Sequence, residues 1–254
     1  MANSSELRLT AVSRTHAGCL RAYNQDAVHV GDYVLAVADG MGGHAHGEVA
    51  SSVAVTVLAE LDAAVAAGEV AEIDKSAALG SVVGEVLRRL DALAARDSGM
   101  HGMGTTITAL LWDGASLLGV HIGDSRAYRW RAGVIEQLTQ DHTLVQSLLD
   151  SGRVTEEEAA VHPRRNLLVR AIQTGGPAEG DLFADPVQPG DRYLLCSDGL
   201  TAVLTDETIA GVLADLADPD AAVDHLIDLS LRGGAPDNVS VVLADVSLAD
   251  PTAD

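Results

Sequence analysis

The chain begins with short hydrophobic runs of the kind that form β-strands. Residues 7–12, 27–30 and 33–38 are rich in Val, Leu and Ala, and Gly31-Asp32 separates the last two runs. A Gly-Asp pair between two such runs is typical of a hairpin turn. We therefore expect an opening strand followed by a hairpin, whose second strand ends at Asp39, ahead of several glycines.

Four later segments show the hydrophobic period of amphipathic helices. Apolar residues recur every three or four positions at 50–61 and again at 82–93, which predicts two packing helices. Two more helices are expected at 206–216, with Thr205 as the N-cap, and at 221–231, where two glycines follow.

Strands and helices are grouped in blocks along the chain. Residues 105–138 form short apolar runs broken by turn pairs, which is typical of antiparallel hairpins, and residues 239–246 predict a last strand. Blocks of strands and of helices, in place of strict alternation, favour an α+β layered fold. The 254 residues contain no Pro/Ser-rich linker, so we expect a single domain over residues 1–254.

Charge and composition exclude several kinds of partner. The formal net charge of −21 at pH 7 would repel the phosphates of a nucleic acid, so we expect no nucleic-acid partner. The sequence has no signal-like start and no apolar run of about 18 residues, so we expect a soluble chain without membrane contact. Cys19 and Cys196 form no disulfide framework, so we expect a reducing, cytoplasmic compartment. We also expect a monomer.

Four aspartates that lie far apart in the sequence share one local setting. Asp39, Asp124, Asp198 and Asp237 each follow or end an apolar segment and stand beside Gly or Asn. Taken singly, each is more simply a turn residue. If the four segment ends converge, however, the carboxylates repel one another unless cations neutralise them. Oxygen ligands suit Mg²⁺ or Mn²⁺ better than Zn²⁺, so the pattern predicts a site for hydrated divalent ions.

Six short motifs follow one another along the chain: Arg21-Ala22-Tyr23-Asn24-Gln25-Asp26, ADGMGGHAHGEVAS at 38–51, GMGTT at 102–106, HIGDSR at 121–126, LCSDGL at 195–200 and APDNVS at 235–240. Together they resemble the ordered motifs of the metal-dependent protein serine/threonine phosphatases, the PP2C or PPM family, in its bacterial form. The resemblance covers residues 8–245 and implies a four-layer αββα sandwich, in which two antiparallel sheets are flanked by pairs of helices.

The resemblance also implies roles for individual residues. Two Mn²⁺ or Mg²⁺ ions would be bound, with Asp39 bridging them, the Gly40 carbonyl on one ion, and Asp198 and Asp237 on the other. Arg21 would hold the substrate phosphate, because a guanidinium can grip two phosphate oxygens at once. Arg21, Asp39 and Asp198 are therefore the expected catalytic residues.

A third, weaker metal site is implied at Asp124 and Asp198, and Asp26 would act through metal-bound water. Ala202 stands where some members of the family supply a further carboxylate, which weakens the third site. Gln25 stands where many members have a Glu. Met41 replaces the His that eukaryotic members use as a proposed general acid. The local histidines, each more simply a surface or structural residue, are His44, His46, His142 and His162.

The resemblance implies hydrolysis of phosphoserine and phosphothreonine in proteins by attack of a metal-activated water, which would reverse the action of Ser/Thr kinases. Two alternatives stay open: a pseudophosphatase that captures phosphoproteins without turnover, and a phosphatase for small phosphate esters. The polar segment 140–170 corresponds to the variable flap beside the active site. It either influences substrate choice or is a surface insertion without such a role.

Overall fold

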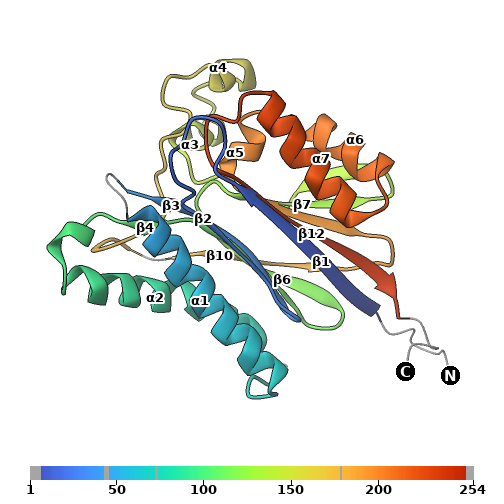
Figure 1. The fold of residues 1–254 in the computed structure, drawn as a ribbon, viewed down its shortest axis with the longest axis horizontal. Coiled ribbons are helices and arrows are strands. Elements are labelled where there is room, and N and C mark those ends of the chain that lie inside the picture. Colours follow the sequence, from blue (N-terminus) through green and yellow to red (C-terminus); the bar gives the residue numbers. More distant parts are fainter. Residues whose placement is uncertain (1–6, 43–45, 72–73, 178, 250–254) are drawn as a thin grey trace.

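Two antiparallel sheets face each other in the computed structural model of the chain (Figure 1). The strands are β1 (Leu7–His16), β2 (Asp26–Val30), β3 (Val34–Met41), β4 (Gly104–Thr105), β5 (Ile107–Trp112), β6 (Ser116–Ile122), β7 (Arg126–Arg131), β8 (Val134–Gln137), β9 (Ile172–Gln173), β10 (Asp181–Pro186), β11 (Arg192–Cys196) and β12 (Val239–Leu248). One sheet has the order β1-β12-β11-β7-β8, and the other has the order β10-β6-β5-β3-β4-β9 with β2 paired to β3. The structure describes residues 7–42, 46–71, 74–177 and 179–249.

Helices cover the outer face of each sheet. The helices are α1 (Gly47–Ala66), α2 (Lys75–Ala94), α3 (Leu144–Asp150), α4 (Glu156–Ala160), α5 (Asp198–Thr201), α6 (Asp206–Asp215) and α7 (Pro219–Arg232), with a 3₁₀ turn at Ser98–Met100. One apolar core joins α1 and α2 to the larger sheet, and a second joins α6 and α7 to the smaller sheet. A third core lies between the sheets. The four-layer α+β sandwich predicted from the sequence is therefore confirmed.

Strand β3 shows how the layers are connected, because its side chains alternate between two cores. Val34, Ala36 and Ala38 pack in the core beneath α1 and α2. Leu35 and Val37 pack in the core between the two sheets. Side chains two residues apart lie on one face of a strand. The next residue on the inter-sheet face is Asp39, which is thereby aimed into the end of the sandwich.

The predicted elements agree with the structure except at some boundaries. The hairpin of β2 and β3, the helices α1, α2, α6 and α7, and the antiparallel hairpins β5–β6 and β7–β8 are all present, the last two in different sheets. Strand β3 continues to Met41, so Asp39 lies inside the strand and not after it. Strands β9 and β10 and helices α4 and α5 were not predicted. The two strands lie at the edges of their sheet and carry little of the alternation that marks a half-buried strand.

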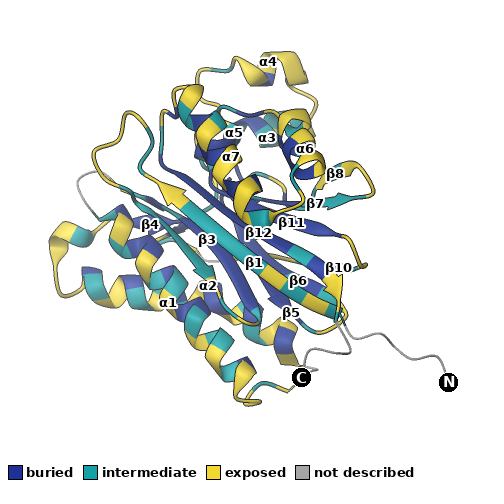
Figure 2. Ribbon diagram, turned by 45° about the vertical axis from the view of Figure 1, so that its right-hand side comes forward, coloured by how far each residue is buried: buried dark blue, intermediate teal, exposed yellow. Residues whose placement is uncertain are grey.

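Helix α1 is long and apolar enough to cross a membrane by length and composition alone. A packing helix passes the same test, and one side of α1, including Ala50, Ala54 and Leu58, is fully buried in the core over the larger sheet. Figure 2 shows this division along the helix, with exposed residues on the outside.

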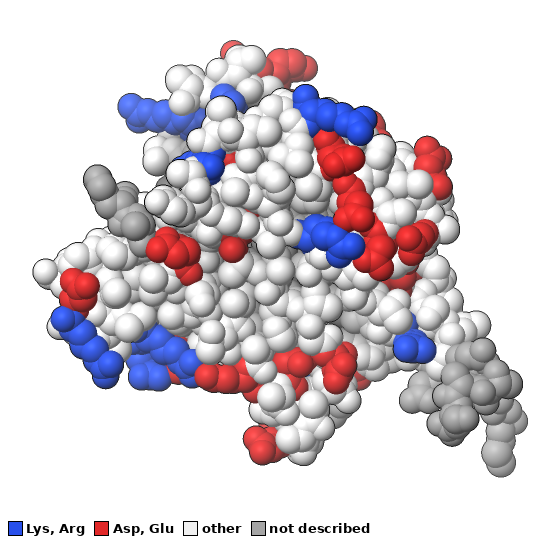
Figure 3. All heavy atoms as spheres, viewed as in Figure 1, with Lys and Arg blue, Asp and Glu red and all other residues white. Residues whose placement is uncertain are grey.

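On the face shown in Figure 3, acidic side chains gather over α6 and α7.

Candidate metal centre

The hairpin of β2 and β3 brings the first two carboxylates together. Asp26 pairs directly with Asp39 across the two antiparallel strands, and directly paired residues point to the same face. The backbone around Asp39 is held by the segment opposite: its N–H donates to Thr106 Oγ1 at 2.9 Å, and its carbonyl accepts from Thr106 N at 2.9 Å. Asp39 is therefore fixed by tertiary hydrogen bonds as well as by its strand.

Asp198 reaches the same place from the other sheet. It opens α5 directly after β11, and Ser197 before it donates from Oγ to Asp26 Oδ2 at 2.7 Å. Ser197 Oγ also accepts from Ser240 N at 2.9 Å, which ties the start of α5 to β12. The end of β11 is thus joined to β2 of the opposite sheet through one hydroxyl, and the two strand ends deliver their carboxylates to one channel.

Asp237 and Arg21 face each other at the mouth of this channel. Arg21 donates to Asp237 Oδ2 at 2.6 Å, and both side chains are partly exposed. The loop that carries Arg21 is held by Asn238, whose Nδ2 donates to the carbonyls of Ala17 and Tyr23 at 2.9 Å each. The structure therefore brings the expected phosphate-binding arginine to the expected metal ligands, and it pairs that arginine with one of them.

These side chains surround a cavity of about 260 Å³. Every residue predicted to bind the two principal ions or the phosphate lines this cavity, and so does Asp124, one of the two weaker candidates. Asp26, the other weaker candidate, does not line it and lies behind Asp39 and Ser197. The lining residues are Arg21, Gln25, Asp39, Gly40, Met41, Gly42, Thr106, Asp124, Asn166, Leu168, Asp198, Asp237 and Asn238. All of the strongest sequence candidates therefore converge at one end of the sandwich.

The carboxylates of the cavity perturb one another's ionisation. Burial, together with the charges of Asp26, Asp198 and Asp124, raises the pKa of Asp39 well above its usual value. Burial is also the main cause that raises the pKa of Asp26 and of Asp198 to about 6 each, and that of Asp124 to about 7. Carboxyl groups this crowded hold protons near neutral pH unless cations neutralise them.

The donor set fits hard divalent cations. Oδ1 of Asp26 and Oδ1 of Asp198 are buried without any hydrogen-bond partner, and a buried acceptor without a partner is costly. No His or Cys among the described residues lines the cavity, so its oxygen ligands suit Mg²⁺ or Mn²⁺. In the described part of the chain, no three His, Cys, Asp or Glu side chains stand ready to hold an ion as they lie. Ligation therefore requires carboxylates to turn, above all Asp237, which now engages Arg21.

Gly40 is required by packing as well as by its expected role. A Cβ at this position would lie 2.1 Å from the carbonyl oxygen of Gly47, at the start of α1. Gly40 N donates to the Gln25 carbonyl at 3.1 Å, and Gln25 Nε2 donates to Glu48 at 3.2 Å. Gln25 thus lies at the cavity wall, where the sequence placed it, with its amide directed to α1.

None of the described histidines lies at the cavity. His142 is buried and accepts from Gly123 N at 3.0 Å through Nδ1, with Nε2 2.9 Å from Asp181. His162 Nδ1 accepts from Arg164 N at 3.1 Å, within the flap, and His46 precedes α1. These contacts are structural, and His44 lies outside the described residues. No general acid is therefore assigned to a histidine here.

The flap reaches the cavity, which the sequence did not predict residue by residue. Segment 140–170 carries α3 and α4, and its two ends pair through Thr143 and Leu168. Asn166 and Leu168 then line the metal cavity. Thr106 and Asn238 were also missed as site residues, although both lie in the quoted motifs. Their hydrogen bonds join segments that are far apart in the sequence, and no local pattern indicates such bonds.

Asp124 lies at the far side of the cavity, in the turn from β6 to β7. Its side chain is 8% exposed, and Asp198 contributes to its raised pKa. Gly123 before it has φ +118°, and a Cβ there would lie 2.4 Å from the Thr106 methyl. The turn therefore needs glycine and directs Asp124 beside Asp198. Ala202, where a further carboxylate was weighed, lies on the same side and adds no ligand.

Together these observations define a class of protein: a two-sheet sandwich whose strand ends gather carboxylates for divalent ions, with an arginine beside them. The chain belongs to the protein phosphatase 2C family, whose model matches residues 20–246. The family predicted from the motifs, and with it the class of metal-dependent serine/threonine protein phosphatases, is confirmed.

Individual relatives show the same class. The chain is 46% identical over 251 residues to the serine/threonine protein phosphatase PstP of Mycobacterium tuberculosis, covering 94% of this chain but only 45% of PstP, less than half of that relative's length. It is 35% identical to the serine/threonine phosphatase Stp of Listeria innocua, covering 92% of this chain and 95% of Stp. The solved catalytic domain of PstP in complex with two manganese ions has a TM-score of 0.86 and 44% identity, covering 95% of this chain and 99% of that one.

Proposed function

We propose that the chain hydrolyses phosphoserine and phosphothreonine in proteins, using two Mn²⁺ or Mg²⁺ ions. The observation that carries this proposal is the cavity in which Asp39 and Asp198 meet, both with raised pKa values, while Arg21 stands at the entrance. The two manganese ions in the related PstP catalytic domain support the number of ions.

Asp39 would bridge the ions, the Gly40 carbonyl would bind one, and Asp198 and Asp237 would bind the other. When bound, the ions supply an activated water and neutralise charge on the phosphoryl oxygens. Asp26 lies behind Asp39, where it would act through water, and Asp124 beside Asp198 is the candidate for a third, weaker ion. These roles are those that the family motifs imply, and the convergence of the side chains on one cavity supports them.

Arg21 would bind the substrate phosphate. In the structure its guanidinium is held by Asp237 at 2.6 Å, so an ion that takes the Asp237 carboxylate would leave the guanidinium for the phosphate. A guanidinium matches two phosphate oxygens in a planar fork. Arg21 thus orients the phosphoryl group toward the metal ligands without acting as a ligand itself.

The partners we infer are phosphorylated proteins, including a Ser/Thr kinase, and we infer that the enzyme is monomeric and cytoplasmic. The relatives named as serine/threonine phosphatases support the phosphoprotein class. The single-domain organisation over residues 1–254, with the core at 8–245 and the flap at 140–170, is part of the same proposal. Capture of phosphoproteins without turnover is the competing function, and the presence of Asp39, Asp198 and Asp237 disfavours it.

Release of phosphate from a phosphothreonine peptide tests the proposal. We expect hydrolysis that depends on Mn²⁺ in the millimolar range, since the open, hydrated site binds hard ions weakly. Excess chelator should abolish it, and added Mn²⁺ should restore it. Peptide binding without phosphate release at saturating Mn²⁺ would favour the capturing regulator. Hydrolysis of small phosphate esters with none of phosphopeptides would favour the metabolite phosphatase.

A further inference from the structure

A second cavity, of about 440 Å³, lies between the flap and α5. It shares Asp124, Asn166 and Asp198 with the metal cavity, so the two adjoin. We call it the flank pocket. Its apolar lining comes from α3, α4 and the end of α5: Val145, Leu149, Ala159, Ala160 and Ala202.

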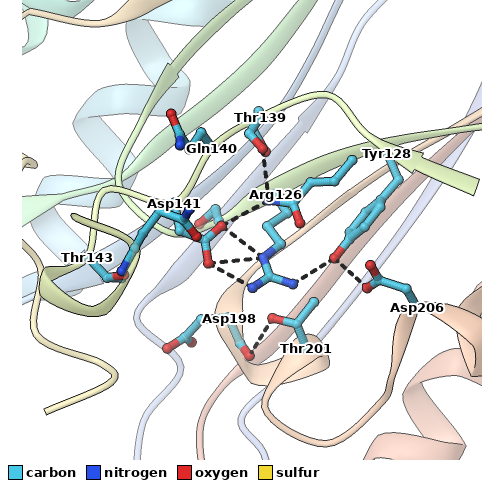
Figure 4. Close-up of polar contacts among 12 residues, drawn as sticks. Arg126, Tyr128, Thr139, Gln140, Asp141, Thr143, Asp198, Thr201 and Asp206 are labelled. Carbon is cyan, nitrogen blue, oxygen red and sulfur yellow. Dashed lines mark hydrogen bonds and ion pairs between the residues drawn. The ribbon is translucent and has the colours of Figure 1, made fainter. Parts of the chain in front are cut away.

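Two charged residues in the lining of the flank pocket, Arg126 and Asp141, are engaged with each other. Arg126 donates from Nε and from one terminal nitrogen to Asp141, at 2.9 and 2.7 Å, and from the other terminal nitrogen to Tyr128 Oη at 2.9 Å. Tyr128 Oη donates to Asp206 at 3.0 Å. Figure 4 shows Arg126 held between Asp141 and Tyr128, with Asp198 and Thr201 nearby. No unpaired charge from this group is left to attract an ionic ligand.

The two flap helices that form one wall of the flank pocket, α3 and α4, are each stabilised by an N-terminal cap. Thr143 caps α3 by accepting from Gln146 N, and Thr155 with Glu158 forms a capping box on α4. Such caps satisfy helix-end donors that would otherwise lack partners. At the base of the flap, Leu144 N donates to the Leu167 carbonyl at 2.8 Å. The short helices are therefore held in place and present their apolar residues to a preformed space.

We propose that the flank pocket binds an apolar side chain of the substrate, close in sequence to the phosphorylated residue. This inference rests on the proposed function, because the phosphate must lie at the metal cavity for a neighbouring residue to enter the adjoining one. The charged residues of the lining are four acids, Asp124, Asp141, Glu156 and Asp198, and two arginines, Arg126 and Arg165. This excess of negative charge disfavours an acidic side chain, and the apolar walls favour an aliphatic one.

A peptide panel measures this preference. Each peptide carries one phosphothreonine in a Gly/Ser background, with leucine placed in turn at each of three positions on either side. At saturating Mn²⁺ we expect one position at which leucine raises kcat/KM by about 5- to 10-fold, the effect of partly burying one aliphatic side chain. Aspartate at that position should give no gain. Equal rates for leucine at all six positions would overturn the inference.

Matched substitutions locate the effect. Ala160→Trp would fill the flank pocket from α4, whereas Val161→Trp adds a similar bulk at the next residue, which is 78% exposed and does not line the pocket. Ala160→Trp should remove the leucine preference and leave hydrolysis of a small aryl phosphate within about 2-fold, and Val161→Trp should change neither. An undiminished preference in Ala160→Trp would overturn the assignment. Leu149→Asn, which makes the wall polar, should reduce the preference if the tryptophan variant does not fold.

The outcome also separates this inference from the function on which it rests. If the unmodified chain with Mn²⁺ releases no phosphate from any peptide, the proposed function and the flank pocket both fail. If it hydrolyses the peptides but leucine has no effect at any position, the phosphatase stands and only the flank pocket is lost.

Discussion

Buried aspartates occur in two regions of this molecule, and they are compensated in different ways. At the sandwich end, Asp39 and Asp198 stand among other carboxylates, and burial with like charges raises their pKa values. Away from that end, Asp191 is 1% exposed and accepts from Arg131 through both carboxylate oxygens, at 2.7 and 2.6 Å. Both regions bury acidic side chains, but only Asp191 has an arginine of its own; at the sandwich end Arg21 pairs with Asp237, and no ion pair of the described residues reaches Asp39 or Asp198.

The difference shows what identifies a metal site in a chain with a net charge of −21. An aspartate with a bidentate arginine is satisfied and structural. An aspartate whose carboxylate oxygen is buried without a partner, as at Asp26 and Asp198, is stable as an anion only with an external cation. The lack of an internal counter-charge, more than the presence of acidic residues, marks the functional end.

The largest effect is expected at Asp39. Asp39→Asn removes the charge that would bridge the ions, so kcat at saturating Mn²⁺ should fall by about 10²- to 10³-fold or more. The same change relieves repulsion in the metal-free protein, so its melting temperature should stay equal or rise. Steady-state kinetics and thermal unfolding in chelator measure the two quantities. Near-normal turnover in Asp39→Asn would contradict the bridging assignment.

Asp191 should respond in the opposite sense. Asp191→Ala removes the bidentate partner of Arg131, which keeps only the Pro186 carbonyl at 2.8 Å and Asp185 at 3.9 Å. This should lower the free energy of unfolding by about 3 kcal/mol and the melting temperature by about 10 °C. The dependence of activity on Mn²⁺ should be unchanged below the melting transition. Replacing Arg131 and Asp191 together by apolar residues should cost less than Asp191→Ala alone. A loss of Mn²⁺ dependence with an unchanged melting temperature would show that the two regions are not distinct.

Arg21 is the one arginine among the described residues that lines the metal cavity, where its charge partly compensates Asp237 as Arg131 compensates Asp191. Arg21→Ala removes a charge-assisted contact to the phosphate of about 1.5 to 3 kcal/mol, so KM should rise about 10- to 150-fold, more than kcat falls. Removal of the ion pair to Asp237, which is partly exposed, should tighten Mn²⁺ binding by less than about 5-fold. An unchanged KM with a collapsed kcat would assign Arg21 to transition-state stabilisation instead.

The sequence predicts the metal end well because its parts are local patterns. A buried apolar run that leads into Asp39 and its glycines can be recognised within ten residues, and the same holds for Asp198 after β11. The period of apolar residues likewise predicts α1 and α2. These patterns express burial and turn chemistry, which act over short stretches of chain.

Other parts of the site depend on contacts that no local pattern records. Arg21 and Asp237 pair across more than two hundred residues, and Asn166 reaches the cavity only because the flap folds back through Thr143 and Leu168. The edge strand β10 is mostly exposed, and its one buried residue is Asp185, so neither burial nor alternation distinguishes it from a loop. Such features become predictable only after the sheets have been assembled.

The smallest expected effect is the pH dependence of stability without metal. It compares the carboxyl groups of the metal cavity, whose pKa values are raised, with a carboxyl group paired to an arginine, whose pKa is lowered. Asp26 and Asp198 have pKa values raised to about 6 and Asp124 to about 7, so the folded state binds more protons than the unfolded state. Their favourable contribution is complete below about pH 4 and is lost as pH rises toward 7. Asp181, whose pKa is lowered to about 2 mainly by its hydrogen bond from Arg170, contributes stability above about pH 4 that is lost as pH falls toward 2.

The two signs together predict a stability maximum for the metal-free protein between about pH 4 and 6. Thermal unfolding in chelator should show the melting temperature falling by about 5 °C from pH 5.5 to pH 8. Saturating Mn²⁺ should remove this fall, because the ions supply the charge that protons provide at lower pH. Asp39→Asn should flatten the chelator curve, while the remote variant Val161→Trp should leave its slope unchanged. A melting temperature that rises from pH 5.5 to pH 8 in chelator would show that the carboxylates of the sandwich end are already compensated within the chain.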